Sequence, residues 1–550
     1  MKKIILLIIL CISQNGNSQQ LTENEKLKNL CKVWGFLKYY HPKIANGETN
    51  WDNSLFDILP KIEKSKNKEE YSNVIENWID NLGEIKKINT LDSDTKIDYF
   101  NKNLNLNWTT KSKFFSKTIS QKLKFITENR FQGKNHYVNR DGETVSLQFT
   151  NEIEYPNFEW TEKNLRILTL FRYWNYVEYF FPYKYVMDQN WDDALLEMLP
   201  KITSPESEKD FIMGLRELSI KLNDTHASTF NMKMMEYLGG EKFIVANTKI
   251  VEEKAIIVSL ANDSLAEIDD LKIGDIITKI NNKTISENLK ELAKYIPGSN
   301  KSAAIPNIGF VMFSGNSDDL EIEFIRDNKI NTKKIHRYLN ENIKRTPPKT
   351  NVKWKILENN IGFVDMSNVD VDNVKIMMEE LKNTKAIIFD DRRRPKYTDF
   401  MINEYLNPEP KEISRDLLQD ISFPGRYIWR KEMQTCGKIN PDFYKGKVIV
   451  LVGSGTFSFG EHTAMSLQTA PDTTIIGSQT AGADGPNYDF TIINGFNSSF
   501  TSSGIFYPNK KETQRIGIVP NIEVKPTILG IQLGKDEVLD RAIKFINIGK

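Results

Sequence analysis

Apolar residues in the last third of the chain form short runs that alternate with amphipathic stretches. The runs read as buried strands and lie at residues 361–366, 386–392, 448–453 and 473–477. Between them, residues 371–382 and the stretch after Ser458 carry apolar positions at helical spacing. Strands that alternate with helices predict a layered α/β domain with parallel strands, which we place at residues 350–550.

A different pattern precedes this domain, at residues 242–340. The apolar run at 255–260 is followed by LKIGDIITKINNKTI at 271–285, with Asn281-Asn282 as a turn between two short strands. The order Gly-Asp, apolar strand, Ile-Asn and turn resembles a PDZ domain. That resemblance implies a β domain that binds an extended peptide, often a free C-terminus, by strand addition.

The first half of the chain contains a duplication. LCKVWGFLKYYHPK and NWDNSLFDILPKI recur as LFRYWNYVEYFFPYK and NWDDALLEMLPKI, with a constant offset of 140 residues. Both copies have apolar residues at helical spacing, so we expect two helical units at residues 20–90 and 156–241. Their aromatic stripes are typical of packing, and two copies indicate a duplication rather than a solenoid.

The two copies diverge at their ends. Leu82-Gly-Glu-Ile-Lys86 in the first corresponds to Leu222-Asn-Asp-Thr-His226 in the second, so a histidine stands where its twin has a lysine. The polar stretch at 91–155 separates the copies. We expect a linker with a few strands and turns there.

Residues 1–18 have the character of a secretory signal. Lys2 and Lys3 precede a short apolar run and then small polar residues. The run is too short to span a bilayer, and no later segment is long and apolar enough. We expect an exported protein, periplasmic or extracellular. A lipoprotein anchored at Cys11 is the alternative, although Leu10 is larger than the residue that usually precedes such a cysteine.

Charge and composition narrow the classes of partner. The 550-residue chain has a net charge of +1 and an ordinary apolar fraction of 39%. It therefore lacks the basic excess that binds nucleic acid, and its length suggests several domains. No CxxC, HExxH or phosphate-cradling glycine loop occurs, so neither metal nor cofactor is implied. Nothing in the pattern sets an oligomeric state.

Ser458 is the clearest candidate for chemistry. It stands where a β-branched run ends in glycines and a helical stretch begins. A serine on such a turn presents its hydroxyl beside free helix N–H groups, which suits a nucleophile whose intermediate is an oxyanion. The other interpretation is a capping box, because Ser458-Phe-Gly-Glu461 also fits S-x-x-E.

Four motifs in order resemble the C-terminal processing, or tail-specific, serine protease family, particularly its tricorn-like branch. They are Asp224-Thr-His226, the strand and turn at 386–395, Ser458-Phe-Gly-Glu461, and the QRIGIVPN segment at 514–521. The resemblance covers the second helical unit, the PDZ-like region and the C-terminal domain. It implies a multidomain α+β and α/β protein with a crotonase-like, tail-specific protease catalytic domain.

The chain departs from the Ser–Lys members of that family. Their turn after the nucleophile helix carries a lysine, whereas this turn reads Thr480-Ala-Gly-Ala483. A histidine is the physical alternative, since imidazole accepts a proton near neutral pH. The resemblance assigns that role to His226, and it assigns Thr225 a hydroxyl that assists the histidine. A capped turn is the structural alternative for Thr225.

The resemblance also suggests the remaining site residues. The family orients its histidine with a glutamate at the position of Gln514, which cannot supply charge, and Glu512 would share the same strand face. The oxyanion would be held by the N–H of Phe459 and by a second donor near Lys396 or Tyr397.

His462 is the internal rival to His226. It lies four residues after Ser458 on one helix face, but one turn inward, so we interpret it as a surface or packing residue.

We therefore expect an exported serine endopeptidase that acts on unfolded or C-terminally presented polypeptides through an acyl-enzyme. A peptide-binding or scaffolding homologue without hydrolysis is the alternative, favoured by Gln514 and the missing lysine. An esterase is disfavoured, because Thr456 replaces the leading glycine of the GxSxG elbow.

Overall fold

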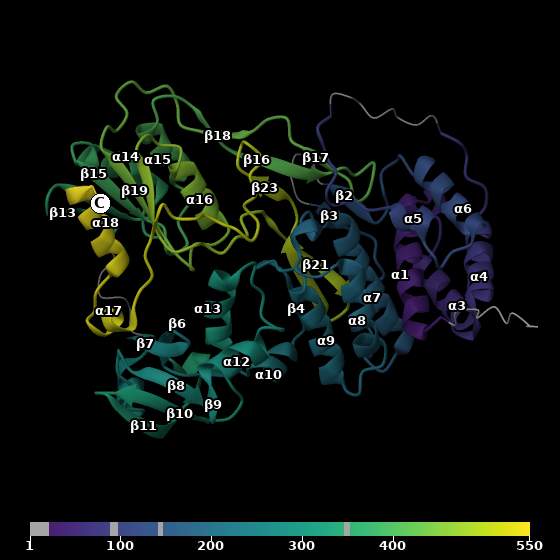
Figure 1. Ribbon diagram of the computed structural model, residues 1–550, viewed down its shortest axis with the longest axis horizontal. Helices are drawn as coiled ribbons and strands as arrows, with labels where there is room; N and C mark the ends of the chain where they lie inside the picture. The colour runs from purple at the N-terminus through teal and green to yellow at the C-terminus, as the bar shows by residue number, and fades with distance from the viewer. Residues whose placement is uncertain (1–20, 89–96, 141–146, 346–351, 550) are drawn as a thin grey trace, which may run out of the picture. The chain divides into compact units, whose positions relative to one another are not determined.

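The computed structural model describes residues 21–88, 97–140, 147–345 and 352–549 (Figure 1). The chain divides into an N-terminal unit, residues 1–90 with 105–131, and a second unit, residues 91–104 with 132–550. The expected signal and Cys11 lie outside the described residues. Among the helices of the described ranges, none has the length and apolar character that crossing a membrane requires.

The N-terminal unit is helical. Its first helix starts at a capping box in which Thr22 and Glu25 satisfy each other's N–H groups. Its helices are α1 (Glu23–Tyr40), α2 (Pro42–Ala45), α3 (Trp51–Lys64), α4 (Lys68–Asp80), α5 (Asn107–Lys111) and α6 (Lys117–Glu128).

The second unit repeats the same helical pattern. Its helices α7 (Lys163–Phe180), α8 (Trp191–Thr203) and α9 (Glu208–Ile220) correspond to α1, α3 and α4. In this copy, Trp174 and Trp191 each donate an indole hydrogen bond to the other's carbonyl oxygen, both at 3.0 Å. Trp34 and Trp51 make the same reciprocal pair in the first copy. The aromatic stripes are therefore packing contacts that fix the helix pair.

The stretch at 91–155 differs from the expected linker of strands and turns. It contributes helices α5 and α6 to the N-terminal unit, and short strands elsewhere. Helix α6 starts at Ser116, whose hydroxyl accepts from Ile119 N–H. Ile119, Leu123 and Ile126 are buried at helical spacing. The polar residues between them hid this period in a lysine-rich sequence. Strands β1 (Tyr99–Phe100), β2 (Val138–Arg140) and β3 (Leu147–Phe149) complete the stretch.

A mostly β domain follows. Its sheet has the order β11-β10-β8-β7-β6, with β9 paired to β8. The predicted Asn281-Asn282 turn is present, and both residues have positive φ, as a two-residue hairpin requires. The strands are β6 (Ala246–Val251), β7 (Lys254–Leu260), β8 (Ile276–Ile280), β9 (Lys283–Thr284), β10 (Asp319–Arg326) and β11 (Lys329–His336), with helices α11 (Asp263–Ile268), α12 (Ile285–Leu292) and α13 (Lys301–Met312).

The C-terminal domain is built on a six-stranded sheet of order β13-β14-β15-β19-β20-β24. All neighbouring pairs except β13–β14 are parallel, as the βαβ rhythm predicts. The alternating side chains of the central strands belong to two separate apolar clusters. One cluster includes residues of α14–α16, and the other includes residues of α18. The elements are β13 (Trp354–Leu357), β14 (Ile361–Asp365), α14 (Val374–Leu381), β15 (Ala386–Asp390), α15 (Asp399–Leu406), β19 (Lys447–Val452), α16 (Phe459–Leu467), β20 (Thr473–Gly477), β24 (Ile522–Glu523), α17 (Ile528–Gln532) and α18 (Glu537–Ile548).

Two smaller sheets tie distant segments together within the second unit. One has the order β1-β17-β16-β18, with β23 paired to β16; the other has the order β21-β22-β4. The second sheet joins the end of the duplicated helices to the C-terminal domain. Their strands are β4 (Ser228–Phe230), β16 (Lys411–Gln419), β17 (Tyr427–Trp429), β18 (Gln434–Cys436), β21 (Asn487–Ile493), β22 (Phe496–Thr501) and β23 (Gly504–Phe506).

We predict that Trp174→Phe lowers the free energy of unfolding by about 1–3 kcal/mol, because the buried carbonyl of Trp191 loses the hydrogen bond from the indole N–H. Urea denaturation measures the change. The control is Trp354→Phe, whose indole donates to Glu380 at an exposed position, and it should cost less than about 1 kcal/mol. Equal losses in the two variants would contradict this account of the tryptophan pair.

Candidate active site

Ser458 occupies a strained turn between β19 and α16. Its φ of 54° and ψ of −119° lie outside the regions that serine readily adopts, and its side chain makes no capping hydrogen bond. Such a conformation costs about 1–3 kcal/mol and persists only where neighbours hold it. Thr456 holds it here by donating from its hydroxyl to the Asp391 carbonyl at 2.7 Å. The hydroxyl of Ser458 is thus left out of the helix cap.

Glu461 does not complete a capping box, so that interpretation is wrong. Its buried carboxylate instead accepts hydrogen bonds from Gly482 N–H at 2.6 Å, Ala483 N–H at 2.8 Å and the Thr480 hydroxyl. Burial raises the pKa of Glu461 to about 7. The turn that carries a lysine in the Ser–Lys members is therefore fixed in this chain by an acid on the nucleophile helix.

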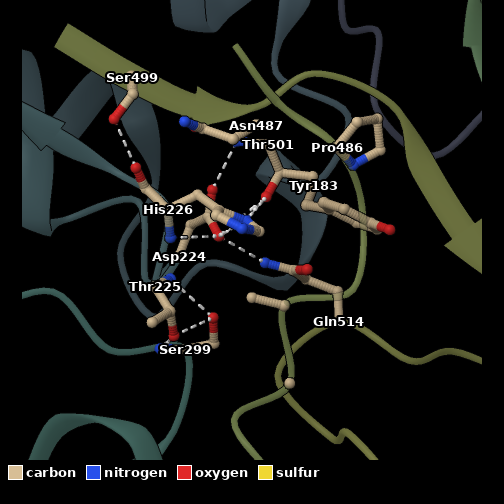
Figure 2. A network of polar contacts seen from close by, with 12 residues as sticks. Tyr183, Asp224, Thr225, His226, Ser299, Pro486, Asn487, Ser499, Thr501 and Gln514 are labelled. Atoms are coloured by element: carbon tan, nitrogen blue, oxygen red, sulfur yellow. Dashed lines mark hydrogen bonds and ion pairs between the residues drawn. The ribbon is translucent and has the colours of Figure 1, made fainter. Parts of the chain in front are cut away.

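His226 lies beside the nucleophile turn. Its ring packs against that of Phe457, with centroids 4.8 Å apart, although the two residues come from opposite sides of the middle β domain. Strand β4, which follows His226, pairs with β22 and anchors this approach. Ser499 on β22 also donates from its hydroxyl to the His226 carbonyl at 2.7 Å (Figure 2).

A hydroxyl links His226 to a buried acid. The His226 Nδ1 lies 3.0 Å from Thr501 Oγ1, and that hydroxyl donates to Asp224 Oδ1, also at 3.0 Å (Figure 2). Because the hydroxyl proton goes to Asp224, the Thr501 oxygen is free to accept from Nδ1–H. This network favours the tautomer that leaves Nε2 as a proton acceptor. Burial lowers the pKa of His226, with Asp224 working in the opposite direction, so the ring is neutral at pH 7.

Thr501 was missed by the sequence analysis. Its only signal was the set of hydroxyl residues in the strand FNSSFT. Side chains alternate between the faces of a strand, but the sequence does not say which face meets the histidine.

The two candidates for orienting the histidine lie in different surroundings. Gln514 donates from Nε2 to Asp224 Oδ1 at 3.2 Å, so it reaches His226 only through that carboxylate (Figure 2). Glu512 accepts from the Tyr185 hydroxyl instead, and burial raises its pKa to about 7. The buried Asp224 is thus the acid nearest the ring, with 3.9 Å between its Oδ1 and Nδ1.

Thr225 contacts the middle β domain. Its N–H donates to the Ser299 hydroxyl at 2.8 Å, and its own hydroxyl accepts from Ser299 N–H at 2.9 Å (Figure 2). Asn300, next along the chain, donates to the carbonyls of Thr480 and Arg515. Residues 299–300 therefore join the histidine segment to the turn after the nucleophile helix.

The expected oxyanion donors lie at two adjoining segments. Phe459 begins α16, where the first-turn N–H groups have no partner within the helix. Its ring packs on that of Tyr397, with centroids 4.2 Å apart. The N–H of Lys396 donates to the Met366 carbonyl at 3.0 Å, whereas that of Tyr397 makes no backbone bond to any described residue. Tyr397 is thus better placed than Lys396 to supply a second donor.

His462 is buried rather than on the surface. Its Nδ1 lies 3.7 Å from Asp484 Oδ2, and its ring neighbours Phe400 and Phe459. Burial opposes protonation, but the nearby Asp484 carboxylate outweighs it and raises the pKa of His462. A histidine that favours its charged form is a poor base at neutral pH.

The described ranges contain no group of His, Cys, Asp and Glu side chains arranged to hold a metal ion.

Comparison with known proteins gives a family match within the C-terminal domain. Residues 360–524 match the model of peptidase family S41. The structure of mature CPAF complexed with lactacystin aligns with a TM-score of 0.54 at 13% identity, covering 70% of this chain and 98% of that one. Mature CPAF alone gives the same values. The photosystem II D1 C-terminal processing protease aligns with a TM-score of 0.41 at 13% identity, covering 68% and 96% of the two chains. No curated protein matches the sequence.

We predict a pH-dependent stability for the Glu461 carboxyl. Since its pKa is raised from 4.5 to about 7 in the fold, its contribution is complete below pH 4.5 and is lost as the pH rises through 7. The free energy of unfolding, relative to that of Glu461→Gln, should therefore fall by about 3 kcal/mol between these pH values.

Urea denaturation at several pH values measures this difference. The matched control is Glu409→Gln, which removes an exposed carboxyl whose pKa is lowered by the hydrogen bond from Lys411. Its difference from the unsubstituted chain should stay flat over the same range. A difference between the unsubstituted chain and Glu461→Gln that stays flat over this range would show that the buried carboxyl does not titrate as described.

Proposed function

We propose, from the premise that the C-terminal domain of this chain belongs to peptidase family S41, that the protein is an exported serine endopeptidase. Its substrates are unfolded or C-terminally presented polypeptides. The observation that carries the proposal is the approach of His226 to the strained nucleophile turn, across a separation of more than two hundred residues. Packing alone does not require an imidazole and a strained serine to meet.

The chemistry we propose is acyl transfer. The Nε2 of His226 takes the proton of Ser458 as the serine oxygen attacks a peptide carbonyl. The N–H groups of Phe459 and Tyr397 stabilise the negative oxygen of the tetrahedral intermediate. His226 then gives the proton to the departing amine, which leaves an acyl-enzyme, and water attacks the acyl-enzyme through the same base.

Asp224 supplies the charge that Gln514 lacks. The carboxylate is 1% exposed and raises the pKa of His226 against the opposing effect of burial. An acid at this distance stabilises the imidazolium that forms during attack. In this scheme Thr501 positions the ring and Gln514 helps to position Asp224. Glu512 and Thr225 hold neighbouring segments through their hydrogen bonds with Tyr185 and Ser299.

The middle domain is the PDZ-like module in this proposal, and it presents the polypeptide. Its contacts run to both halves of the site. Ser299 pairs with Thr225, while Ser302 donates from its hydroxyl to the Gln479 carbonyl at 2.6 Å. A peptide bound to this domain would thus act on the segment that carries the base and on the turn after the nucleophile helix.

A peptide-binding homologue without hydrolysis is the second candidate. The observation that favours it is Gln514, whose buried Oε1 has no hydrogen-bond partner among the described residues. Both candidates predict peptide binding, and only the protease predicts a reactive serine.

The first test is covalent labelling of Ser458 by a fluorophosphonate, with cleavage of an unfolded protein as the second readout. We expect both in the unsubstituted chain and neither in Ser458→Ala. The matched control is Ser454→Ala in the same loop, which should keep both. Equal cleavage by the Ser458→Ala chain would remove the nucleophile assignment.

The base is tested separately. His226→Ala should lower kcat at least about a hundredfold. An active His226→Ala enzyme together with an inactive His462→Ala enzyme would show that His226 is not the base.

A second test concerns Thr501. Thr501→Val removes the hydroxyl between His226 and Asp224, so kcat should fall by about 10- to 100-fold with little change in KM. Thr501→Ser keeps the hydroxyl and should restore most of the rate. Since the pKa of His226 is lowered, the acid limb of kcat/KM in the unsubstituted chain should lie below pH 6.5. A valine variant as active as the serine variant would contradict the relay.

A further inference from the structure

A cavity in the N-terminal unit has no role in the proposed chemistry. It has a volume of about 590 Å³ and lies between the end of α4 and helix α6. His41 lines it at the corner between α1 and α2, with Ile79 and Phe125 among its apolar walls. Asp80 and Lys122, which form an ion pair, also line it. The cavity therefore combines an apolar interior with a few polar groups, which is typical of binding sites.

His41 is the unexplained group in this cavity. It is 2% exposed, and neither of its ring nitrogens has a hydrogen-bond partner among the described residues. Burial, with the charge of Lys43, lowers the pKa of His41 to about 4. The neutral ring offers one donor and one acceptor. A buried polar group without partners costs about 1–3 kcal/mol, so a ligand that pairs with it would recover that cost.

The duplication indicates what covers this face. The residue that corresponds to His41 in the second copy is Phe181, which also ends a long helix before a proline. The ring of Phe500, on the extended strand β22, packs against Phe181 with centroids 5.8 Å apart. Beside it, Asp224 accepts a hydrogen bond from the backbone N–H of Thr501 at 2.8 Å. The second copy therefore uses this face to hold an extended strand and its aromatic side chain.

The first copy has a carboxylate at the corresponding position but no such strand in the described residues. Glu84 stands at the position of Asp224, is exposed, and also lines the cavity. It has no hydrogen-bond or ion-pair partner among the described residues. A carboxylate there is available to accept a backbone N–H from an incoming segment, as Asp224 does from Thr501.

We infer that this cavity binds an extended segment of the substrate polypeptide, which places a large apolar side chain in the cavity, a backbone polar group on the His41 ring and a backbone N–H on Glu84. The inference rests on the proposed function, because the protease's unfolded substrate is the source of the segment. It makes the N-terminal unit an anchoring site separate from the scissile bond.

The experiment uses the full chain with Ser458→Ala, so that bound peptide is not cleaved. The probe is the nine-residue peptide of residues 495–503, with benzoylphenylalanine at the position of Phe500, for photo-crosslinking and mass spectrometry. We expect adducts at 79–85 and 121–126. His41→Leu, which removes both ring nitrogens but keeps an apolar wall, should lower their yield at least about fivefold, and Glu84→Ala about threefold.

The controls separate this inference from the proposed function. His136→Phe, outside the cavity, should leave the adducts at 79–85 and 121–126 unchanged. Crosslinking does not require an active serine, so failure of fluorophosphonate labelling would leave this result standing. Adducts only elsewhere, or adducts insensitive to both His41→Leu and Glu84→Ala, would overturn the inference. Binding of p-cresol in the cavity without any peptide adduct would also overturn it, in favour of a small apolar ligand.

Discussion

The candidate site depends on the hydrogen-bond requirement of one buried carboxylate. Asp224 accepts from the N–H of His226, the N–H and hydroxyl of Thr501, and the side-chain amide of Gln514. A buried charge without donors is costly, so these three segments are held together by the same constraint. The histidine is positioned because it lies two residues from the acid.

A second buried acid organises the nucleophile side. Glu461 lies on the first turn of α16, and it draws the turn at 480–483 toward that helix. Gly517 approaches the same carboxylate so closely that a Cβ there would meet Glu461 Oε1 at 2.7 Å. Its φ of 64° also favours glycine. The turn therefore uses backbone N–H groups toward an acid, where the Ser–Lys members place a lysine.

The duplicated helical units illustrate how one packing pattern serves two purposes. Both copies keep the tryptophan pair that fixes their helices. In the second copy, β22 covers the side of the helical unit that includes Phe181 and places Thr501 beside the histidine. In the first copy, the corresponding side borders a cavity that has α6 as another wall. The internal repeat is stable in either setting because its tryptophan contacts lie within each copy.

Local features of this protein could be predicted from the sequence. The alternation of apolar strands and helices predicted the parallel sheet, because periodicity directly reflects burial on one face. The constant offset between copies predicted the repeated helices, and the order of four motifs predicted the family. The helix α6 was missed, since lysines and polar residues between Ile119, Leu123 and Ile126 obscured a short apolar stripe.

Only the tertiary structure decided which polar groups meet. Ser458 and Glu461 fit a capping box by spacing alone, yet the strained backbone at Ser458 sends Glu461 to another turn. Likewise, Gln514 and Glu512 share a strand pattern in the sequence, but only Gln514 reaches Asp224. Sequence periodicity records which face of an element is buried. The partner of a buried polar group is set by chain segments hundreds of residues away, which the local pattern does not encode.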